Sequence, residues 1–213
     1  MQGELLPLFP LNVVLFPRAS LPLHIFEDRY KEMIGDVIEN HSEFGVVLAR
    51  EQGIVNVGCT ATVEKVIKRY RDGRMDIQTI GRRRFEVLLL NEEKSYLRAP
   101  VEFFDDQEAE PAPLAMRQKA LESWTTLQES HEARAIEEPA IDDPLLSFQL
   151  AQLVPDLDFR QTLLNLRSEP ERIKQLVSFL EDYVPRHSYV TRVRSVASSN
   201  GHGIRPVDLK DRS

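Results

Sequence analysis

The chain has 213 residues, of which 42% are hydrophobic and 29% are charged, and its formal net charge is −7. This length allows one large domain or two small ones, and the composition is that of a soluble globular protein. The acidic balance argues against phosphate-backbone binding as the main activity, and the single cysteine, Cys59, excludes an internal disulfide and a cysteine-based zinc cluster.

The chain begins with an apolar stretch that prolines interrupt. Residues 6–26 read LPLFPLNVVLFPRASLPLHIF. A secretory signal needs a basic start and an unbroken apolar core, whereas Glu4 precedes this run. A membrane-spanning helix needs about 20 apolar residues, and interior prolines would break it. We therefore predict short strands with prolines at strand ends or edges, in a cytoplasmic protein with no membrane contact.

An amphipathic helix is predicted next, over 27–40. Five apolar residues fall on one helical stripe: Tyr30, Met33, Ile34, Val37 and Ile38. Acidic Glu27 and Asp28 lie at its start, where the helix dipole favours them.

A strand-rich region follows the helix. The run FGVVLA, at 44–49, is typical of a strand buried on both faces. Asp72-Gly73 predicts a hairpin with a type I′ turn. Further strands are expected at 57–70, 74–81, 84–90 and 97–104. This pattern predicts an α+β protein that begins with a small, partly closed, mostly antiparallel β-barrel.

Helices dominate the rest of the chain. The acidic stretch DDQEAEPAP, at 105–113, is typical of a domain boundary. Helices are expected over 114–131, from Asp143-Pro144 to 153, from an Asp158 cap to 166, and from the capping box SEPE (168–171) to Pro185. The predicted organisation is a barrel subdomain at 1–106, a linker at 107–113, a helical subdomain at 114–185 and a basic, flexible tail at 186–213.

Catalytic signatures are missing from the sequence. It contains no P-loop, no Gly-x-Gly-x-x-Gly and no Gly-x-Ser-x-Gly. His131-Glu132 begins like a metal-binding His-Glu-x-x-His helix, but Ala135 replaces the second ligand. We expect no catalytic residue, no metal ligand and no cofactor.

Three other features have structural interpretations. His24, between Leu23 and Ile25, is expected to be a structural histidine, exposed or hydrogen-bonded. Cys59 is expected to be a small buried hydrophobic residue. The cluster GRRRF, at 81–85, is expected at a solvated hairpin corner or paired with carboxylates, and it lacks the aromatic platform of single-stranded nucleic-acid readers. Nucleic acid is therefore a disfavoured partner.

In their order and spacing, these motifs together resemble the N-terminal substrate-binding domain of the Lon (La) ATP-dependent proteases. The resemblance extends over about 4–184. It rests on the stretch 5–34, VGCTATVEKV (57–66), the Asp72-Gly73 turn, GRRRF as the family's Gly-x-x-Arg-Phe, and the helical stretch 142–181. Because the chain ends soon after that stretch, we expect a stand-alone form without the ATPase and protease domains.

The resemblance implies a PUA-like barrel joined to a helical subdomain, and a non-enzymatic polypeptide-binding or adaptor module. The expected partners are unfolded or degron-bearing polypeptides, with a protease or chaperone, in protein quality control; the oligomeric state stays open. An extended segment is expected to bind in a groove between barrel and helices. The candidate contacts are Phe16, Pro17, Leu21, Arg82, Arg83 and Arg84.

Two alternatives remain at this point. One is a small-molecule or enzymatic pocket that brings together His24, Tyr30 and the Arg82–Arg84 group. The other is RNA binding by the barrel, against which the acidic balance argues.

Overall fold

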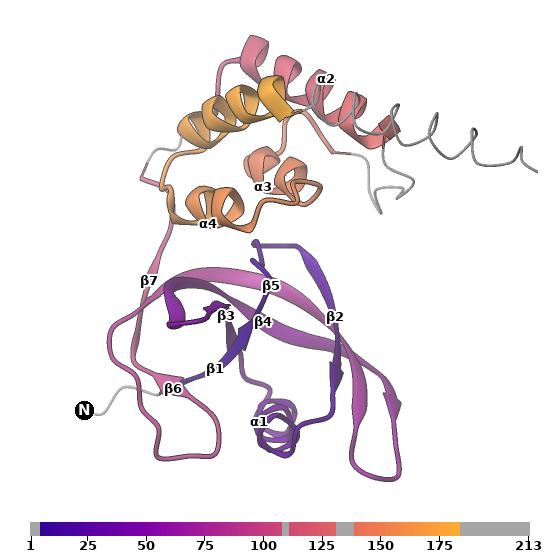
Figure 1. Ribbon diagram of the computed structural model, residues 1–213, viewed down its shortest axis with the longest axis vertical. Helices are drawn as coiled ribbons and strands as arrows, with labels where there is room; N and C mark the ends of the chain where they lie inside the picture. Colours follow the sequence, from indigo (N-terminus) through magenta and orange to yellow (C-terminus); the bar gives the residue numbers. More distant parts are fainter. Residues whose placement is uncertain (1–4, 108–110, 131–138, 184–213) are drawn as a thin grey trace, which may run out of the picture.

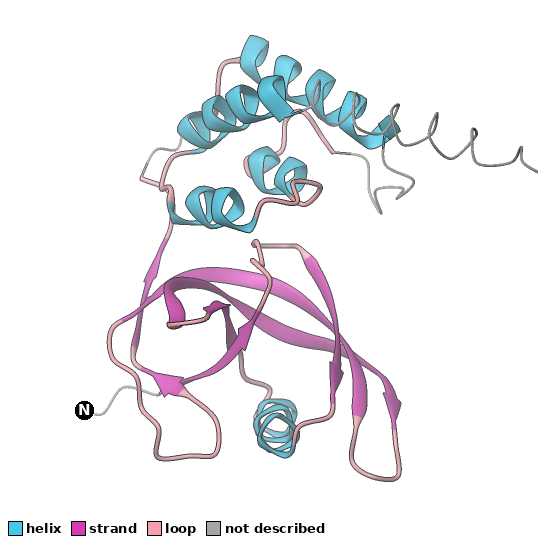
Figure 2. Cartoon of the chain, viewed as in Figure 1, coloured by secondary structure: helices cyan, strands magenta, loops and turns pink. Residues whose placement is uncertain are grey.

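The computed structural model describes residues 5–107, 111–130 and 139–183 (Figure 1). In chain order its elements are β1 (Leu6–Leu11), β2 (Ser20–Ile25), α1 (Asp28–Glu39), β3 (Phe44–Arg50), β4 (Gly53–Arg69), β5 (Met75–Val87), β6 (Arg98–Ala99), β7 (Val101–Phe104), α2 (Leu114–Ser130), α3 (Leu146–Ala151) and α4 (Leu157–Asn165), followed by a helix over 169–183. The sheet lies between α1 and the other helices (Figure 2). The α+β class is confirmed.

The sheet closes on itself as a barrel. Its strand order is β2-β5-β4-β3-β1-β6, and β7 pairs with β5. β6 pairs with β1, and only Pro100 separates β6 from β7. Because these two consecutive strands pair with β1 and with β5, the ring β5-β4-β3-β1-β6/β7 is complete. All of these pairs are antiparallel except β1 with β3.

Two of the N-terminal prolines lie where the sheet needs no donor. Leu8 N–H points away from β3 and donates to Leu97 O at 2.8 Å. Because successive amides along a strand point to opposite sides, Pro10 N, two residues later, points to the same side as Leu8 N–H. β6 pairs only with Leu6 and Pro7, so nothing on that side requires a donor from Pro10. Pro22 lies in β2, which is the terminal strand of the order. The predicted edge placement is confirmed at Pro10 and Pro22.

The local patterns of the first half predict its core correctly. α1 begins one residue after the predicted start and buries Tyr30, Met33, Ile34 and Val37. The residues of β3 from Phe44 to Leu48 are all buried, as expected for a strand covered on both faces.

The turn between β4 and β5 is a hairpin, but the predicted type I′ turn is wrong. Gly73 has φ of 85°, whereas Asp72 does not have a positive φ. Tyr70 N–H donates to Arg74 O at 2.8 Å, and Gly73 N–H donates to Tyr70 O at 3.1 Å. This is the three-residue loop in which a type I turn precedes a left-handed residue, so only Gly73 needs a positive φ.

The GRRRF cluster does not form a corner, so the corner interpretation is wrong. The alternative interpretation, pairing with carboxylates, is confirmed at Arg83 with Glu43 and at Arg84 with Asp106. β5 runs without interruption from Met75 to Val87 and then ends, so the predicted strand to Leu90 is too long. At Gly81 a loop from β1 to β2 lies directly on β5: Arg18 N–H donates to Gly81 O, and Gly81 N–H donates to Ala19 O. A Cβ atom on Gly81 would lie 2.1 Å from Phe16 O. Glycine is required here by close backbone approach.

The helix starts agree with the predictions in part. Ser168 Oγ accepts from Glu171 N–H, so the predicted cap at this residue is confirmed. α4 is capped by Asp156, which accepts from two amides, and the predicted cap at Asp158 is wrong. α3 begins at Leu146, later than predicted, because Asp143 Oδ1 accepts from Leu145 N–H in a preceding turn.

Several predicted features lie outside the described residues. They are His131-Glu132, the helix end at Pro185 and the tail at 186–213. Within the described ranges, no helix combines the length and the apolar character that crossing a bilayer requires.

Replacing Gly81 by alanine should destabilise the fold. The new Cβ would overlap a backbone oxygen that cannot rotate away, so we expect the free energy of unfolding to fall by about 2–3 kcal/mol in urea denaturation. The control is Gly35→Ala at an exposed position of α1, where no atom lies within 4 Å of the new Cβ. That variant should gain up to about 1 kcal/mol from helix propensity. Equal stability of the two variants would contradict the close approach.

Candidate functional site

The six residues predicted to contact a polypeptide fall into two groups. Phe16 is fully buried, and Arg84 is only 4% exposed. The other four, Pro17, Leu21, Arg82 and Arg83, are partly or fully exposed. The structure therefore does not bring the six together on one surface.

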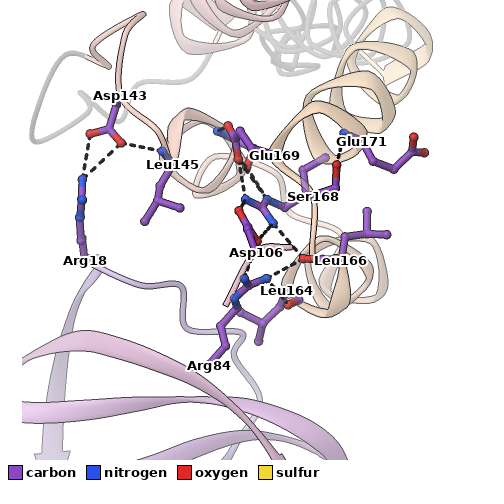
Figure 3. A network of polar contacts seen from close by, with 12 residues as sticks. Arg18, Arg84, Asp106, Asp143, Leu145, Leu164, Leu166, Ser168, Glu169 and Glu171 are labelled. Carbon is purple, nitrogen blue, oxygen red and sulfur yellow. Dashed lines mark hydrogen bonds and ion pairs between the residues drawn. The ribbon is translucent and has the colours of Figure 1, made fainter. Parts of the chain in front are cut away.

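Arg84 belongs to a buried network between the sheet and the helices (Figure 3). Its guanidinium donates to Asp106 Oδ1 at 2.5 Å and to the carbonyl oxygens of Leu164 and Leu166. Asp106 also accepts from Arg172, which donates in addition to Glu169. The sequence placed Asp106 in an acidic boundary segment, and the structure makes it the centre of this network.

Apolar and surface contacts reinforce the same junction. Phe16 stacks on Phe148 of α3 with ring centroids 5.0 Å apart. At the periphery, Arg18 Nη1 lies 3.1 Å from Asp143 Oδ2 (Figure 3). At these contacts, side chains fill the space between the barrel and the helices. The predicted groove is therefore not found at this part of the junction.

The network shifts two carboxyl groups in opposite directions. Burial opposes ionisation of Asp106, but the hydrogen bonds and charges of Arg172 and Arg84 outweigh it and hold the Asp106 pKa below its usual range. Burial raises the pKa of Glu169, and the bonds from Ser147 and Arg172 offset this only in part. The two arginines thus stabilise Asp106 as an anion.

A hollow of about 900 Å³ lies at the mouth of the barrel. Its lining comes from β1, the C-terminal part of α1, the turn before β3, β5, the segment before β6, β6 and β7. The lining residues are Leu5, Leu6, Pro7, Asp36, Val37, Asn40, Ser42, Glu43, Arg83, Asn91, Glu93, Lys94, Tyr96, Arg98, Pro100, Val101 and Phe103. We call this feature the mouth hollow.

One wall of the mouth hollow is a polar triad. Asp36 Oδ2 accepts from Lys94 Nζ at 2.8 Å and from Tyr96 Oη at 2.9 Å. These two donors hold the Asp36 pKa below its usual range, and the bond from Lys94 to Asp36 holds the Lys94 pKa above its own. Burial raises the pKa of Tyr96. At neutral pH the triad therefore contains one anion, the Asp36 carboxylate, and one cation, the Lys94 ammonium, and Tyr96 is neutral.

The other walls also contain paired cations. Arg83 Nη2 lies 3.1 Å from Glu43 Oε2. The guanidinium carbon of Arg83 lies over the Phe103 ring, 3.8 Å from the ring centroid. Arg98 donates to Asn91 Oδ1 at 3.1 Å and to Glu93 Oε2 at 3.2 Å. Arg98 Nε is buried and has no acceptor within the part of the chain that the structure describes.

Of the six predicted residues, Arg83 alone lines the mouth hollow. Phe103 was assigned only to a strand, because a single aromatic residue in an alternating run gives no sign of which surface it will face. Glu43 and Asp36 were missed because they meet Arg83 and Lys94 only through the folded chain.

The lining of the mouth hollow combines paired charges with apolar side chains. Its described lining contains no histidine or cysteine, and all three of its cations are paired with carboxylates. Its remaining lining is largely apolar, and Phe103 is 43% exposed. Such a lining can contact an apolar side chain and can hydrogen-bond a backbone.

The residues of the small-molecule alternative do not converge. His24 Nδ1, on the terminal strand β2, lies 2.5 Å from Asp76 Oδ1 on the neighbouring β5, which confirms a hydrogen-bonded histidine. Tyr30 is buried and stacks on Phe9 at 4.1 Å, while Arg84 lies in the junction. Cys59 is a buried thiol, as predicted, and burial raises its pKa to about 12.

Comparison with known proteins identifies related sequences and structures. Residues 5–182 match the ATP-dependent protease La (LON) substrate-binding domain. A Lon protease of Parabacteroides distasonis is 29% identical over 49% of this chain. A Lon protease of Anaeromyxobacter dehalogenans is 32% identical over 48% of this chain. The matches cover only 14% and 13% of those two proteases, so the chain spans a small part of their length.

Two solved structures of Lon N-terminal domains share the fold. A Lon N-terminal domain protein from Xanthomonas campestris is 25% identical with a TM-score of 0.66, over 82% of this chain and 98% of that one. The N-terminal domain of Lon protease from the Mycobacterium avium complex is 16% identical with a TM-score of 0.64, over 84% of this chain and 100% of that one. The second likeness concerns the fold alone.

Replacing Asp106 by asparagine should destabilise the protein and alter its pH dependence. Two buried arginines would lose their shared anion, so the free energy of unfolding at neutral pH should fall by about 3 kcal/mol. Because the folded pKa of Asp106 lies below the unfolded value of about 3.9, its contribution is complete above that pH and is lost as the pH falls through the folded pKa.

The test is urea denaturation of both proteins across acid pH. The stability difference between native protein and Asp106→Asn should be constant near neutral pH and shrink below about pH 4. Asp105→Asn, at the exposed neighbouring residue, is the matched control and should change stability by less than about 0.5 kcal/mol. A difference that grows on acidification would contradict the role of Asp106.

Proposed function

The chain belongs to the family of the ATP-dependent protease La (LON) substrate-binding domain, and we propose that it binds unfolded or degron-bearing polypeptides in its mouth hollow. The relationship is to this substrate-binding part of the Lon proteases and not to their protease part. We further propose that the protein is not an enzyme and that it acts as an adaptor.

The observation that carries this proposal is the composition of the mouth hollow. Leu6, Val101 and Phe103 offer apolar contact to side chains that an unfolded polypeptide exposes. Arg98 Nε is a buried donor without an acceptor in the described residues, and a peptide carbonyl would satisfy it. Because every cation there already has an anionic partner, the hollow favours uncharged segments over phosphates or nucleic acids.

The cellular setting is a proposal of the same kind. The family description names an ATP-dependent protease, so a protease or a chaperone is the natural recipient of a bound polypeptide. We propose a role in protein quality control in the cytoplasm. In the proposed organisation the barrel, 1–106, supplies the binding hollow, and the helical part, 114–185, follows a linker at 107–113.

Replacing Phe103 by alanine should weaken polypeptide binding by about tenfold, because an exposed aromatic contact in the hollow is lost. The measurement is fluorescence anisotropy with a labelled, permanently unfolded protein of near-zero net charge whose cysteines are capped with uncharged groups. Phe26→Ala is the matched control, since Phe26 is also an exposed phenylalanine, at 59%, but does not line the hollow.

The two variants must differ for the site assignment to hold. If both lose affinity equally, binding depends on general surface hydrophobicity and not on the mouth hollow. If the native protein binds no unfolded polypeptide at all, the proposed function itself fails.

A further inference from the structure

β4 extends beyond the strand that flanks it. β3 pairs with β4 only as far as Ala61, opposite Phe44, whereas β5 pairs with β4 as far as Arg69. From Glu64 to Arg69, no described strand pairs with β4 on the side away from β5. The backbone N–H and C=O groups on that side of an edge strand are available to another chain. We call residues Glu64–Arg69 of β4 the open edge.

The open edge is basic in a protein that is acidic overall. Between Glu64 and Arg74 the chain has five basic and two acidic residues, a net charge of +3 in a chain whose net charge is −7. Lys65, Arg69 and Arg71 are exposed and form no ion pair with a described residue. Lys68 lies over the Tyr70 ring, 4.4 Å from its centroid. The cations are therefore available to an external partner.

Charged residues and bulges commonly protect edge strands from indiscriminate pairing. The open edge has both, with register shifts between Val63 and Lys65 and between Val66 and Lys68. Charges of one sign, however, repel only one class of strand and attract the other. Ile67, which is 57% exposed, adds an apolar contact in the middle of the edge.

We propose that the open edge binds an acidic, extended polypeptide segment, which adds to the sheet as a strand beside β4. The partner's carboxylates would meet Lys65 and Arg69, its apolar residues would cover Ile67, and its backbone would pair with the edge. This surface is separate from the mouth hollow, since none of its residues lines that hollow.

Other occupants fit the edge less well. Two copies of the chain would place like charges opposite each other if their open edges paired, which is unfavourable across a strand pair. Single-stranded RNA could meet the cations, but it cannot supply the regular backbone donors and acceptors that an edge strand leaves unpaired. An acidic strand satisfies both the charge and the backbone.

Binding of short fluorescein-labelled peptides to the full chain tests the proposal. The probes are a peptide in which glutamate and valine alternate, its lysine–valine counterpart, and the glutamate–valine peptide with alternate amides N-methylated along one edge. We expect the first to bind, with affinity that falls as salt is raised. The second should not bind, and the third should lose at least about tenfold in affinity because it cannot pair as a strand.

Charge reversal localises the binding. Lys65→Glu with Arg69→Glu should weaken binding of the glutamate–valine peptide by about tenfold or more. The matched control is Lys119→Glu with Lys174→Glu on the helices, which changes the net charge equally at exposed residues and should leave the affinity within about twofold. Circular dichroism melting confirms that both variants fold.

Three outcomes would overturn the proposal. They are equal binding by the open-edge variant and its control, undiminished binding of the N-methylated peptide, and displacement of the acidic peptide by single-stranded RNA at lower concentration. The Phe103→Ala variant separates this inference from the proposed function, because it should keep its affinity for the acidic peptide while losing affinity for the unfolded protein.

Discussion

One carboxylate, that of Asp106, holds the barrel and the helices in a single arrangement. It lies between Arg84 from β5 and Arg172 from the last described helix, and both guanidinium groups are almost completely buried. A buried arginine without an anion is costly, so separation of the two halves would leave two such charges stranded. The chain passes through this contact as it leaves β7, which makes the connection between the halves part of their interface.

This junction buries two of the residues that the sequence offered as polypeptide contacts. Phe16 and Arg84 are residue types that often contact ligands. In this structure Phe16 instead stacks on Phe148, and Arg84 donates to Asp106, so both join the barrel to the helices. The two surfaces that we propose for binding belong to the barrel: the mouth hollow, with its paired charges over apolar residues, and the open edge of β4. We propose that the first binds neutral segments and the second binds acidic ones, so that one domain offers two chemically distinct contacts.

The arginine cluster shows why spacing alone could not locate the site. Side chains alternate along a strand, so adjacent arginines face opposite sides of the sheet. Arg83 therefore lies over Phe103 at the mouth hollow, while Arg84 lies in the junction. The sequence reveals three arginines in a row, but it does not show whether they occupy a turn or a continuous strand. The turn interpretation, which would have exposed all three, was wrong.

The sequence by itself determined the local features: the stripe of α1, the buried run of β3, the cap at Ser168, the hairpin at Gly73 and the order of strands before helices. Each depends on residues within a few positions of one another, through helical period, strand burial or capping. Only the tertiary structure decided which strands close the predicted barrel, the role of Asp106, the mouth hollow and the open edge. These depend on which strands pair and which side chains meet across long separations, and local periodicity does not contain that information.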